Sequence, residues 1–302
     1  MITSKDRYLE LENSYIKETI FHDDLETNIW YKTDNNKKAI IWVPGYNDYY
    51  YHFHIGEKFI KNKYDIWALF PHNYKKCSES FYIDDISKYF LQIDKIIEKM
   101  DDYNYESIIL YGHSTGGLSV TSYCSLGNMK DKISKLILNS PFLDFGNSTH
   151  SDFLLKYVVY YIGKFFKKIC LREINENTEN KLKDYILSNY YFSDKYIYNG
   201  NAPIYSGWVY TMIDYQTRFQ NGLFKTDKPI LVISSDTFTN DISIKKGDDV
   251  LNVNEFDSWM SNLGDNVTNI KIENALHDVL SSDDIIVNQA CHDIFKWLDN
   301  NI

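Results

Sequence analysis

The sequence predicts an α/β protein in which helices cover both faces of a mainly parallel central sheet. Short apolar runs, typical of strands buried on both faces, alternate along the chain with segments of helical periodicity. The alternation stops between residues 140 and 228, where helical patterns rich in Tyr, Phe and Trp replace the buried-strand runs. We therefore expect a core formed by residues 1–140 and 227–302, with residues 141–226 inserted between core strands as a helical cap.

The elements follow in order along the chain. Ser14–Phe21 and Asn28–Lys32 alternate as expected for a hairpin around His22-Asp23-Asp24. Buried strands are expected at Lys38–Val43, Asp65–Leu69, Ser107–Tyr111, Lys135–Asn139, Lys228–Ser234 and Val267–Ile272. Helices are expected at 55–62, 86–100 and 287–298 and, within the insertion, at 153–170 and 182–191.

Composition and charge indicate which classes of partner the protein binds and in which cellular compartment it lies. A formal net charge of -10 argues against nucleic-acid binding, which needs a concentrated basic face. The charged start lacks the apolar core of a signal peptide, and the apolar stretch Phe153–Ile162 is too short to span a bilayer. Cys77, Cys124, Cys170 and Cys291 are scattered, as expected of reduced thiols. We therefore expect a cytoplasmic protein without stable membrane insertion.

The segment Ile108–Gly117 carries the main functional signal. A short apolar run enters the pattern G-x-S-x-G, formed by Gly112, Ser114 and Gly116, and a chain able to form a helix leaves it. A strand–turn–helix of this kind holds a serine at the end of a sheet with its hydroxyl exposed. The flanking glycines are needed because side chains there would crowd the sharp turn. Ser114 is therefore the candidate nucleophile.

A serine needs a base and an orienting acid, because its hydroxyl ionises too weakly to attack a carbonyl unaided. His277 is the best candidate base, since it lies between the last predicted strand and the closing helix. His113, within the elbow, is expected to point away from the serine. His52 and His54 form an H-x-H pair, which we interpret as partly exposed and not as a metal site.

The acid and the oxyanion donors are less clearly marked. Asp236, Asp248 and Asp249 all follow the predicted strand at 228–234, and spacing alone slightly favours Asp236. An oxyanion hole requires fixed backbone N–H donors. Position alone indicates the amide of Thr115, directly after the nucleophile, and the amide of Tyr46, in the turn after Lys38–Val43.

Together these motifs resemble the α/β-hydrolase superfamily, in particular its serine aminopeptidase-like and lysophospholipase-like (monoacylglycerol lipase-like) branch. The matching segments run in order from Pro44–Tyr50 through Gly112–Leu118, Gly207-Trp208, Gly222-Leu223 and Asp248–Val253 to Leu276–Ser281. The resemblance implies the α/β-hydrolase fold and a cofactor-independent hydrolase of carboxylic esters. It also implies Asp248 as the acid of the triad, in preference to Asp236 and Asp249.

Two other functions remain open at this point. One is a serine peptidase acting on short peptides, for which Glu173, Glu176 or Glu179 would hold the amino terminus of the substrate. The other is a non-catalytic ligand-binding protein on the same scaffold, because a fold does not fix a function.

The cap is expected to determine the substrate. Phe153, Tyr157, Tyr161, Phe165 and Phe166 fall on one helical face, near Lys164, Lys167 and Lys168. We favour the interpretation that this stripe packs on the core. In the alternative, Phe165, Phe166 and Trp208 are substrate or lid residues, and the cap touches a small ester or lipid-like substrate, or transiently a lipid surface.

Overall fold

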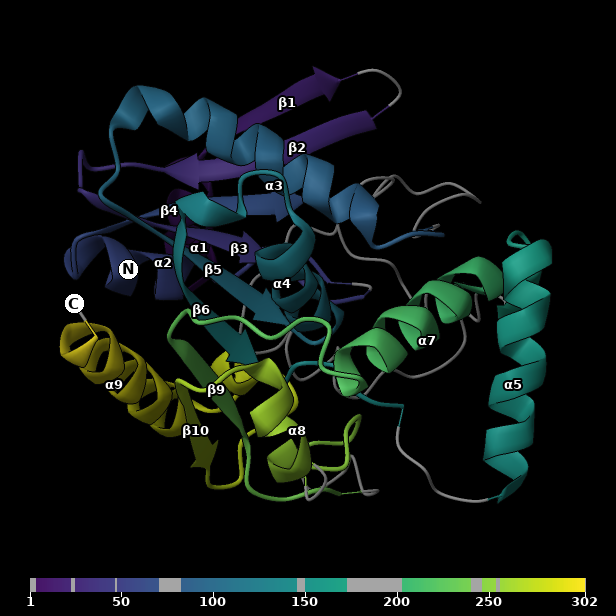
Figure 1. Cartoon of the computed structure of the whole chain (residues 1–302). Helices are drawn as coiled ribbons and strands as arrows, with labels where there is room; N and C mark the ends of the chain where they lie inside the picture. The colour runs from purple at the N-terminus through teal and green to yellow at the C-terminus, as the bar shows by residue number, and fades with distance from the viewer. Residues whose placement is uncertain are drawn as a thin grey trace.

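The computed structural model describes residues 4–22, 25–46, 48–70, 83–145, 150–172, 203–239, 246–253 and 256–301. The central element of this structure is an eight-stranded sheet with the order β1-β2-β4-β3-β5-β6-β9-β10 (Figure 1). The strands are β1 (Ile16–His22), β2 (Leu25–Lys32), β3 (Lys38–Val43), β4 (Tyr64–Phe70), β5 (Ser107–His113), β6 (Ile133–Asn139), β9 (Ile230–Ser235) and β10 (Val267–Ile272).

Strand pairing confirms the predicted mainly parallel sheet. β1 and β2 form the predicted antiparallel hairpin, and β2 also pairs antiparallel with β4. The pairs β4–β3, β3–β5, β5–β6, β6–β9 and β9–β10 are all parallel. The carboxyl ends of these parallel strands therefore meet at one edge of the sheet, where ligands bind in folds of this kind.

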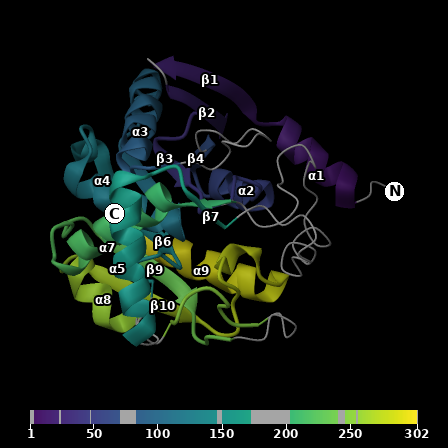
Figure 2. The same cartoon turned by 90° about the vertical axis from the view of Figure 1, so that its right-hand side faces the viewer.

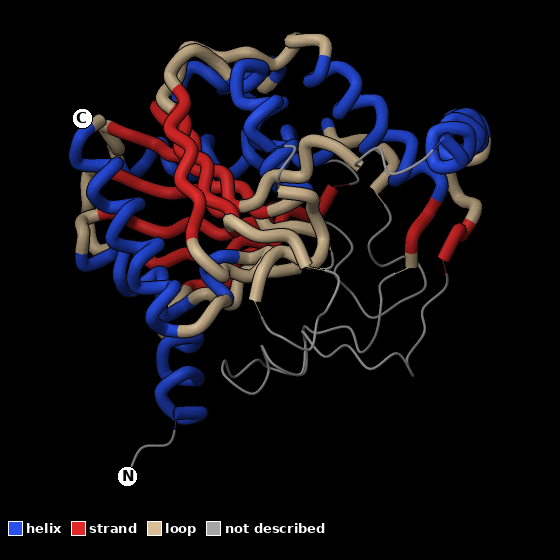
Figure 3. Tube along the Cα trace, turned by 90° about the horizontal axis from the view of Figure 1, so that it is seen from below, coloured by secondary structure: helices blue, strands red, loops and turns tan. Residues whose placement is uncertain are grey.

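Helices cover both faces of the sheet (Figure 3). The helices α1 (Ser4–Asn13), α2 (Phe53–Lys61) and α9 (Asp284–Asn300) contribute to one core cluster. The helices α3 (Ser87–Met100), α4 (Thr115–Leu126) and α7 (Ser206–Gln220) contribute to the other, against which α8 (Phe256–Leu263) also packs.

Alternation within the strands explains why there are two clusters. In β3, Ile40 and Trp42 belong to the cluster with α2 and α9, whereas Ile41 and Val43 belong to the cluster with α3 and α4. Successive side chains of a strand point to opposite faces, so a strand covered on both sides must be apolar throughout. This is why the unbroken run Lys-Ala-Ile-Ile-Trp-Val predicted β3 with its observed bounds.

The segment between β6 and β9 contains no buried strand in its described part. α5 (His150–Phe165) packs along α7 and stands away from the sheet (Figures 1 and 2). The short strands β7 (Cys170–Arg172) and β8 (Ile204–Tyr205) pair with each other as a separate two-stranded sheet. The helix expected at 182–191 lies outside the described residues.

No helix in the described part of the chain is both long enough and apolar enough to cross a membrane.

Candidate active site

The candidate nucleophile Ser114 lies between the end of β5 and the start of α4. Its backbone has φ 51° and ψ -119°, a conformation that favours glycine and is strained for a serine. Two glycines permit the sharp turn: a Cβ at Gly112 would lie 2.6 Å from the carbonyl oxygen of Gly116, and a Cβ at Gly116 would lie 2.4 Å from that of Val43. The strand–turn–helix predicted from the motif is thus present.

The turn after β3 packs directly against this elbow. A Cβ added at Gly45 would lie 3.1 Å from the Cβ of Ser114. The amide of Tyr46 therefore belongs to a turn adjoining the serine, and the amide of Thr115 is the first N–H of α4. The N–H groups of the first helical turn have no intrahelical acceptor, so the Thr115 amide is available to a ligand oxygen. Both candidate oxyanion donors lie at the carboxyl edge of the sheet.

His277 lies in the loop after β10 and is paired with Asp248. The Nδ1 atom of His277 is 2.9 Å from Oδ2 of Asp248, and both side chains are buried. The backbone amides of Val250 and Leu251 donate to the other oxygen of Asp248, each at 2.8 Å. Burial alone would raise the pKa of Asp248, but the His277 partner and these amides outweigh it and lower the pKa.

The second ring nitrogen of His277 has no such partner. Nε2 is buried, and none of the described residues forms a hydrogen bond with it. Buried polar groups are normally satisfied, so an unsatisfied one in a native protein calls for an explanation. The His277 ring is therefore held by a carboxylate at Nδ1 and has no described hydrogen-bond partner at Nε2.

The other two candidate acids are placed differently. Asp236 is exposed and accepts a hydrogen bond from the backbone N–H of Asn274 at 2.9 Å, as a turn aspartate does. Asp249 is half-buried, and burial is the main cause that raises its pKa. Of the three, Asp248 is the one whose carboxylate lies within hydrogen-bond distance of His277.

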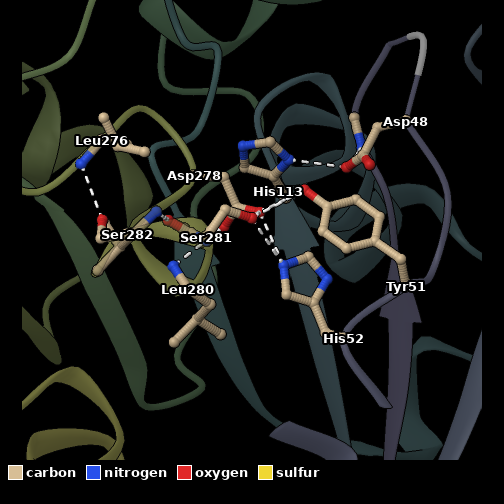
Figure 4. A network of polar contacts seen from close by, with 12 residues as sticks. Asp48, Tyr51, His52, His113, Leu276, Asp278, Leu280, Ser281 and Ser282 are labelled. Carbon is tan, nitrogen blue, oxygen red and sulfur yellow. Dashed lines mark hydrogen bonds and ion pairs between the residues drawn. The ribbon is translucent and has the colours of Figure 1, made fainter. Parts of the chain in front are cut away.

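A second buried carboxylate, Asp278, directly follows His277. Its oxygens accept hydrogen bonds from Asn139 Nδ2 (2.7 Å) and Ser281 Oγ (2.5 Å), and contact His52 Nε2 (2.8 Å; Figure 4). The expectation that His52 is partly exposed is therefore wrong: it is buried because it pairs with Asp278. Burial opposes the charge, yet His52, His113 and these donors hold the pKa of Asp278 well below its usual range.

His113 approaches the candidate base more closely than its place in the motif suggested. Its ring centroid is 5.1 Å from that of His277, and its Nδ1 atom is 3.0 Å from Oδ2 of Asp48. Burial lowers the pKa of His113, but the carboxylates of Asp278 and Asp48 outweigh this effect, and the net shift is upward. Within the described part of the chain, no three His, Cys, Asp or Glu side chains form a metal-binding group.

The candidate substrate or lid residues fall into two environments. Trp208 is buried and its ring centroid lies 4.6 Å from that of Tyr46, whose hydroxyl donates to the carbonyl of Pro203. Phe165 and Phe166, in contrast, are 70% and 65% exposed. The expectation that the aromatic stripe packs on the core is wrong for the described side chains Tyr157, Tyr161, Phe165 and Phe166, because α5 buries its other side against α7.

Comparison with known proteins identifies the family. Residues 34–281 match the model of the family described as serine aminopeptidase, S33. The chain belongs to this family. The match includes Ser114, Asp248 and His277 and begins just before β3. No curated protein matches the chain in sequence.

Solved structures similar to this S33-family chain include lipases and an esterase. A soluble variant of the monoglyceride lipase from Saccharomyces cerevisiae is 14% identical with a TM-score of 0.72, covering 95% of this chain and 96% of that one. The monoacylglycerol lipase of Paleococcus ferrophilus is 17% identical, with a TM-score of 0.68 and coverage of 92% and 99%. A carboxyl esterase from Bacillus coagulans is 14% identical, with a TM-score of 0.71 and coverage of 95% and 98%. These similarities show the α/β-hydrolase fold.

Sequence reasoning missed two acidic residues of this S33-family site. Asp48 and Asp278 lie within the matching segments Pro44–Tyr50 and Leu276–Ser281, but the sequence gives neither a role of its own. Neither residue has a recognisable motif of its own, because the hydrogen-bond partners of both come from strands that are distant in the chain. The available signal was the position of Asp48 and Asp278 in loops that open at the carboxyl edge of the sheet.

Proposed function

We propose that this protein hydrolyses carboxylic esters through an acyl-enzyme formed on Ser114. The observation that carries the proposal is the buried Asp248–His277 pair, in which Nδ1 of His277 contacts the carboxylate and Nε2 has no hydrogen-bond partner among the described residues. The ring of His277 lies 5.1 Å from the ring of His113, the residue directly before Ser114 in the chain, which supports a role for the pair at the elbow. The family and the fold are consistent with hydrolysis, and the printed names of the similar structures favour esters.

In the proposed mechanism, Ser114 attacks the ester carbonyl while Nε2 of His277 takes the proton of its hydroxyl. Asp248 accepts from Nδ1, fixes the tautomer of the ring and stabilises the imidazolium. The amides of Tyr46 and Thr115 bind the oxyanion of the tetrahedral intermediate. His277 then donates its proton to the leaving alcohol. Water repeats the sequence and releases the acid from Ser114.

Residues 141–226 form the cap in this proposal, and residues 1–140 and 227–302 form the catalytic core. The exposed aromatic side chains of α5, with Lys164 beside them, support contact with an acyl chain or transiently with a lipid surface. The peptidase alternative takes its support from the family name. The glutamates that we considered for it, Glu173, Glu176 and Glu179, lie outside the described residues.

The first experiment is labelling by a fluorophosphonate probe, which requires no knowledge of the substrate. We expect labelling of the wild type and none of Ser114→Ala or His277→Ala, because phosphonylation requires an activated serine. Ser125→Ala, on the same helix, is the matched serine control and should label as the wild type does. Absence of labelling in a folded wild type would contradict the proposal and favour a binding protein. Faster turnover of peptide anilides than of esters would favour the peptidase.

A further inference from the structure

The Asp48 carboxylate joins the turn after β3 to the last residue of β5. Its Oδ2 atom accepts from the backbone N–H of Gly45 at 3.3 Å and from Nδ1 of His113 at 3.0 Å. Its Oδ1 atom accepts from the N–H of Tyr49 at 2.7 Å. One side chain thus connects two segments that are separated in the chain by α2, β4 and α3. Figure 4 shows this contact above the Asp278 network.

The segments joined by Asp48 are the ones that supply the candidate oxyanion donors. Gly45 immediately precedes Tyr46, and His113 immediately precedes Ser114 and Thr115. Contact between the segments is close, since a Cβ at Gly45 would meet His113 Nδ1 at 3.2 Å as well as the Cβ of Ser114. Packing of this kind limits how near the segments can approach. A shared hydrogen-bond acceptor also fixes their relative orientation.

The charge of the pair strengthens this contact. The side chains of Asp48 and His113 are 13% and 10% exposed, so water screens their attraction weakly. The raised pKa of His113 favours its imidazolium form, in which Nδ1 is necessarily a donor. Charge-assisted hydrogen bonds are shorter and stronger than neutral ones.

We propose that Asp48 is a positioning residue that holds the oxyanion turn against the nucleophile elbow, acting through His113 and the Gly45 amide. This inference rests on the proposed function, because it assigns a role to a residue of the same site. The physical reason is that oxyanion donors must meet a charge that develops only in the transition state. A displacement of the Tyr46 amide weakens that interaction without changing how the ground-state ester binds.

The test compares Asp48→Asn with Asp65→Asn in steady-state ester hydrolysis. An asparagine offers one acceptor oxygen where the carboxylate offers two, so either the Tyr49 contact or the shared Gly45 and His113 contact is lost. We expect kcat to fall about 10- to 100-fold with KM unchanged within about twofold, since a misplaced transition-state donor affects kcat alone.

Asp65 is the matched control. It is also a buried aspartate that ties a loop to a strand, accepting from Asn36 Nδ2 at 2.7 Å and from the hydroxyl of Tyr105 at 2.8 Å. It lies near the start of β4, at the edge of the sheet opposite the elbow. Asp65→Asn should lower the melting temperature and leave kcat unchanged. If Asp48→Asn and Asp65→Asn have the same kcat, or if only KM changes, the inference is wrong.

A double-mutant cycle with His113→Leu tests whether Asp48 acts through His113. If it does, the double variant loses no more kcat than Asp48→Asn alone, whereas independent effects would multiply and contradict the inference.

If Asp48→Asn fails to fold, Asp48→Glu replaces it, since it moves the carboxylate by one methylene and should show the same loss of kcat. A wild type that neither labels nor hydrolyses esters would refute the proposed function instead, so the two failures are distinguishable.

Discussion

Ser114, the candidate nucleophile, has an unfavourable backbone conformation. Its φ of 51° and ψ of -119° suit glycine, and a side chain held in such a region costs about 1–3 kcal/mol. The conformation persists because β5 and α4 are both anchored: the N–H of Ser114 donates to the carbonyl of Asn139, and its own carbonyl accepts from Phe142. These hydrogen bonds therefore hold Ser114 in a backbone conformation that a serine does not favour by itself.

This strain predicts that Ser114→Gly stabilises the protein while removing the nucleophile. We expect the free energy of unfolding to rise by about 1 kcal/mol, because relief of strain exceeds the entropy that a glycine adds to the unfolded chain. Urea denaturation would measure the change. Ser114→Ala is the control, since it removes the hydroxyl but keeps the Cβ and should gain nothing. Equal stability of the two variants would argue against strain at this residue.

At the residue scale, the sequence revealed the candidate nucleophile and base more readily than the residues that support them. The motif around Ser114 is local, and the strand order places His277 after β10, so both could be predicted. Distance along the chain from the strand at 228–234 favoured Asp236 as the acid. The loop that brings Asp248 back to His277 has no periodic sequence pattern, so its path could not be predicted. Asp48 and Asp278 act through partners from other strands, and such partners emerge only from the folded chain.

At the scale of the elements, α5 and the residue that follows it expose several aromatic side chains. Phe165, Phe166, Tyr157 and Tyr161 are exposed, although α5 packs along α7. Scattered exposed apolar residues need no explanation, but a contiguous group on one helix indicates a surface for binding.

If α5 contacts the acyl chain, the double variant Phe165→Ser/Phe166→Ser should impair hydrolysis of long-chain esters selectively. We expect kcat/KM to fall roughly 10-fold for long chains and little for acetate esters, because two apolar contacts that together contribute about 1.4 kcal/mol are lost. A series of p-nitrophenyl esters of increasing length would measure it. Phe21→Ser, at an exposed phenylalanine of β1, should leave the series unchanged. Equal losses at all chain lengths would exclude the lid interpretation.

Element prediction succeeded where periodicity was strong. β3 and β10 have the bounds predicted for them, and the closing helix α9 begins three residues earlier than its apolar pattern. α1 and α8 were not predicted. The sequence Ser-Lys-Asp-Arg-Tyr-Leu-Glu-Leu-Glu-Asn of α1 is mostly polar, and its few apolar residues gain their stability from tertiary contacts such as that of Tyr8 with Phe53.

At the scale of the whole molecule, Asp278 joins two distant parts of the chain to its own loop. Its partners come from the loop after β3 (His52), the end of β6 (Asn139) and its own loop (Ser281). A buried carboxylate with this many donors is costly to replace, because the donors are left unsatisfied.

We therefore expect Asp278→Asn to destabilise the whole fold by about 3 kcal/mol at pH 7. Because folding lowers the pKa of Asp278 below 3.8, its contribution is fully present above that value and is lost as the pH falls through the folded pKa. The gap in stability between the wild type and the variant should stay constant from pH 7 to pH 5 and narrow below pH 4. Urea unfolding at each pH measures this gap, with the exposed Asp102→Asn as control. A gap that persists undiminished at pH 3 would contradict the assignment.

The order of the strands also has a consequence for biosynthesis. β6 pairs with β9, so that Leu136 lies beside Ile230, yet the whole insertion separates them in the chain. At about 5–20 residues per second, β9 leaves the ribosome roughly 5–20 seconds after β6. Until then the apolar residues Leu136, Ile137 and Leu138 lie on an open sheet edge, which is the kind of edge that seeds aggregation. In a nascent chain whose β6 folds before β9 is made, this edge therefore stays open until Ile230 pairs with Leu136 and covers it.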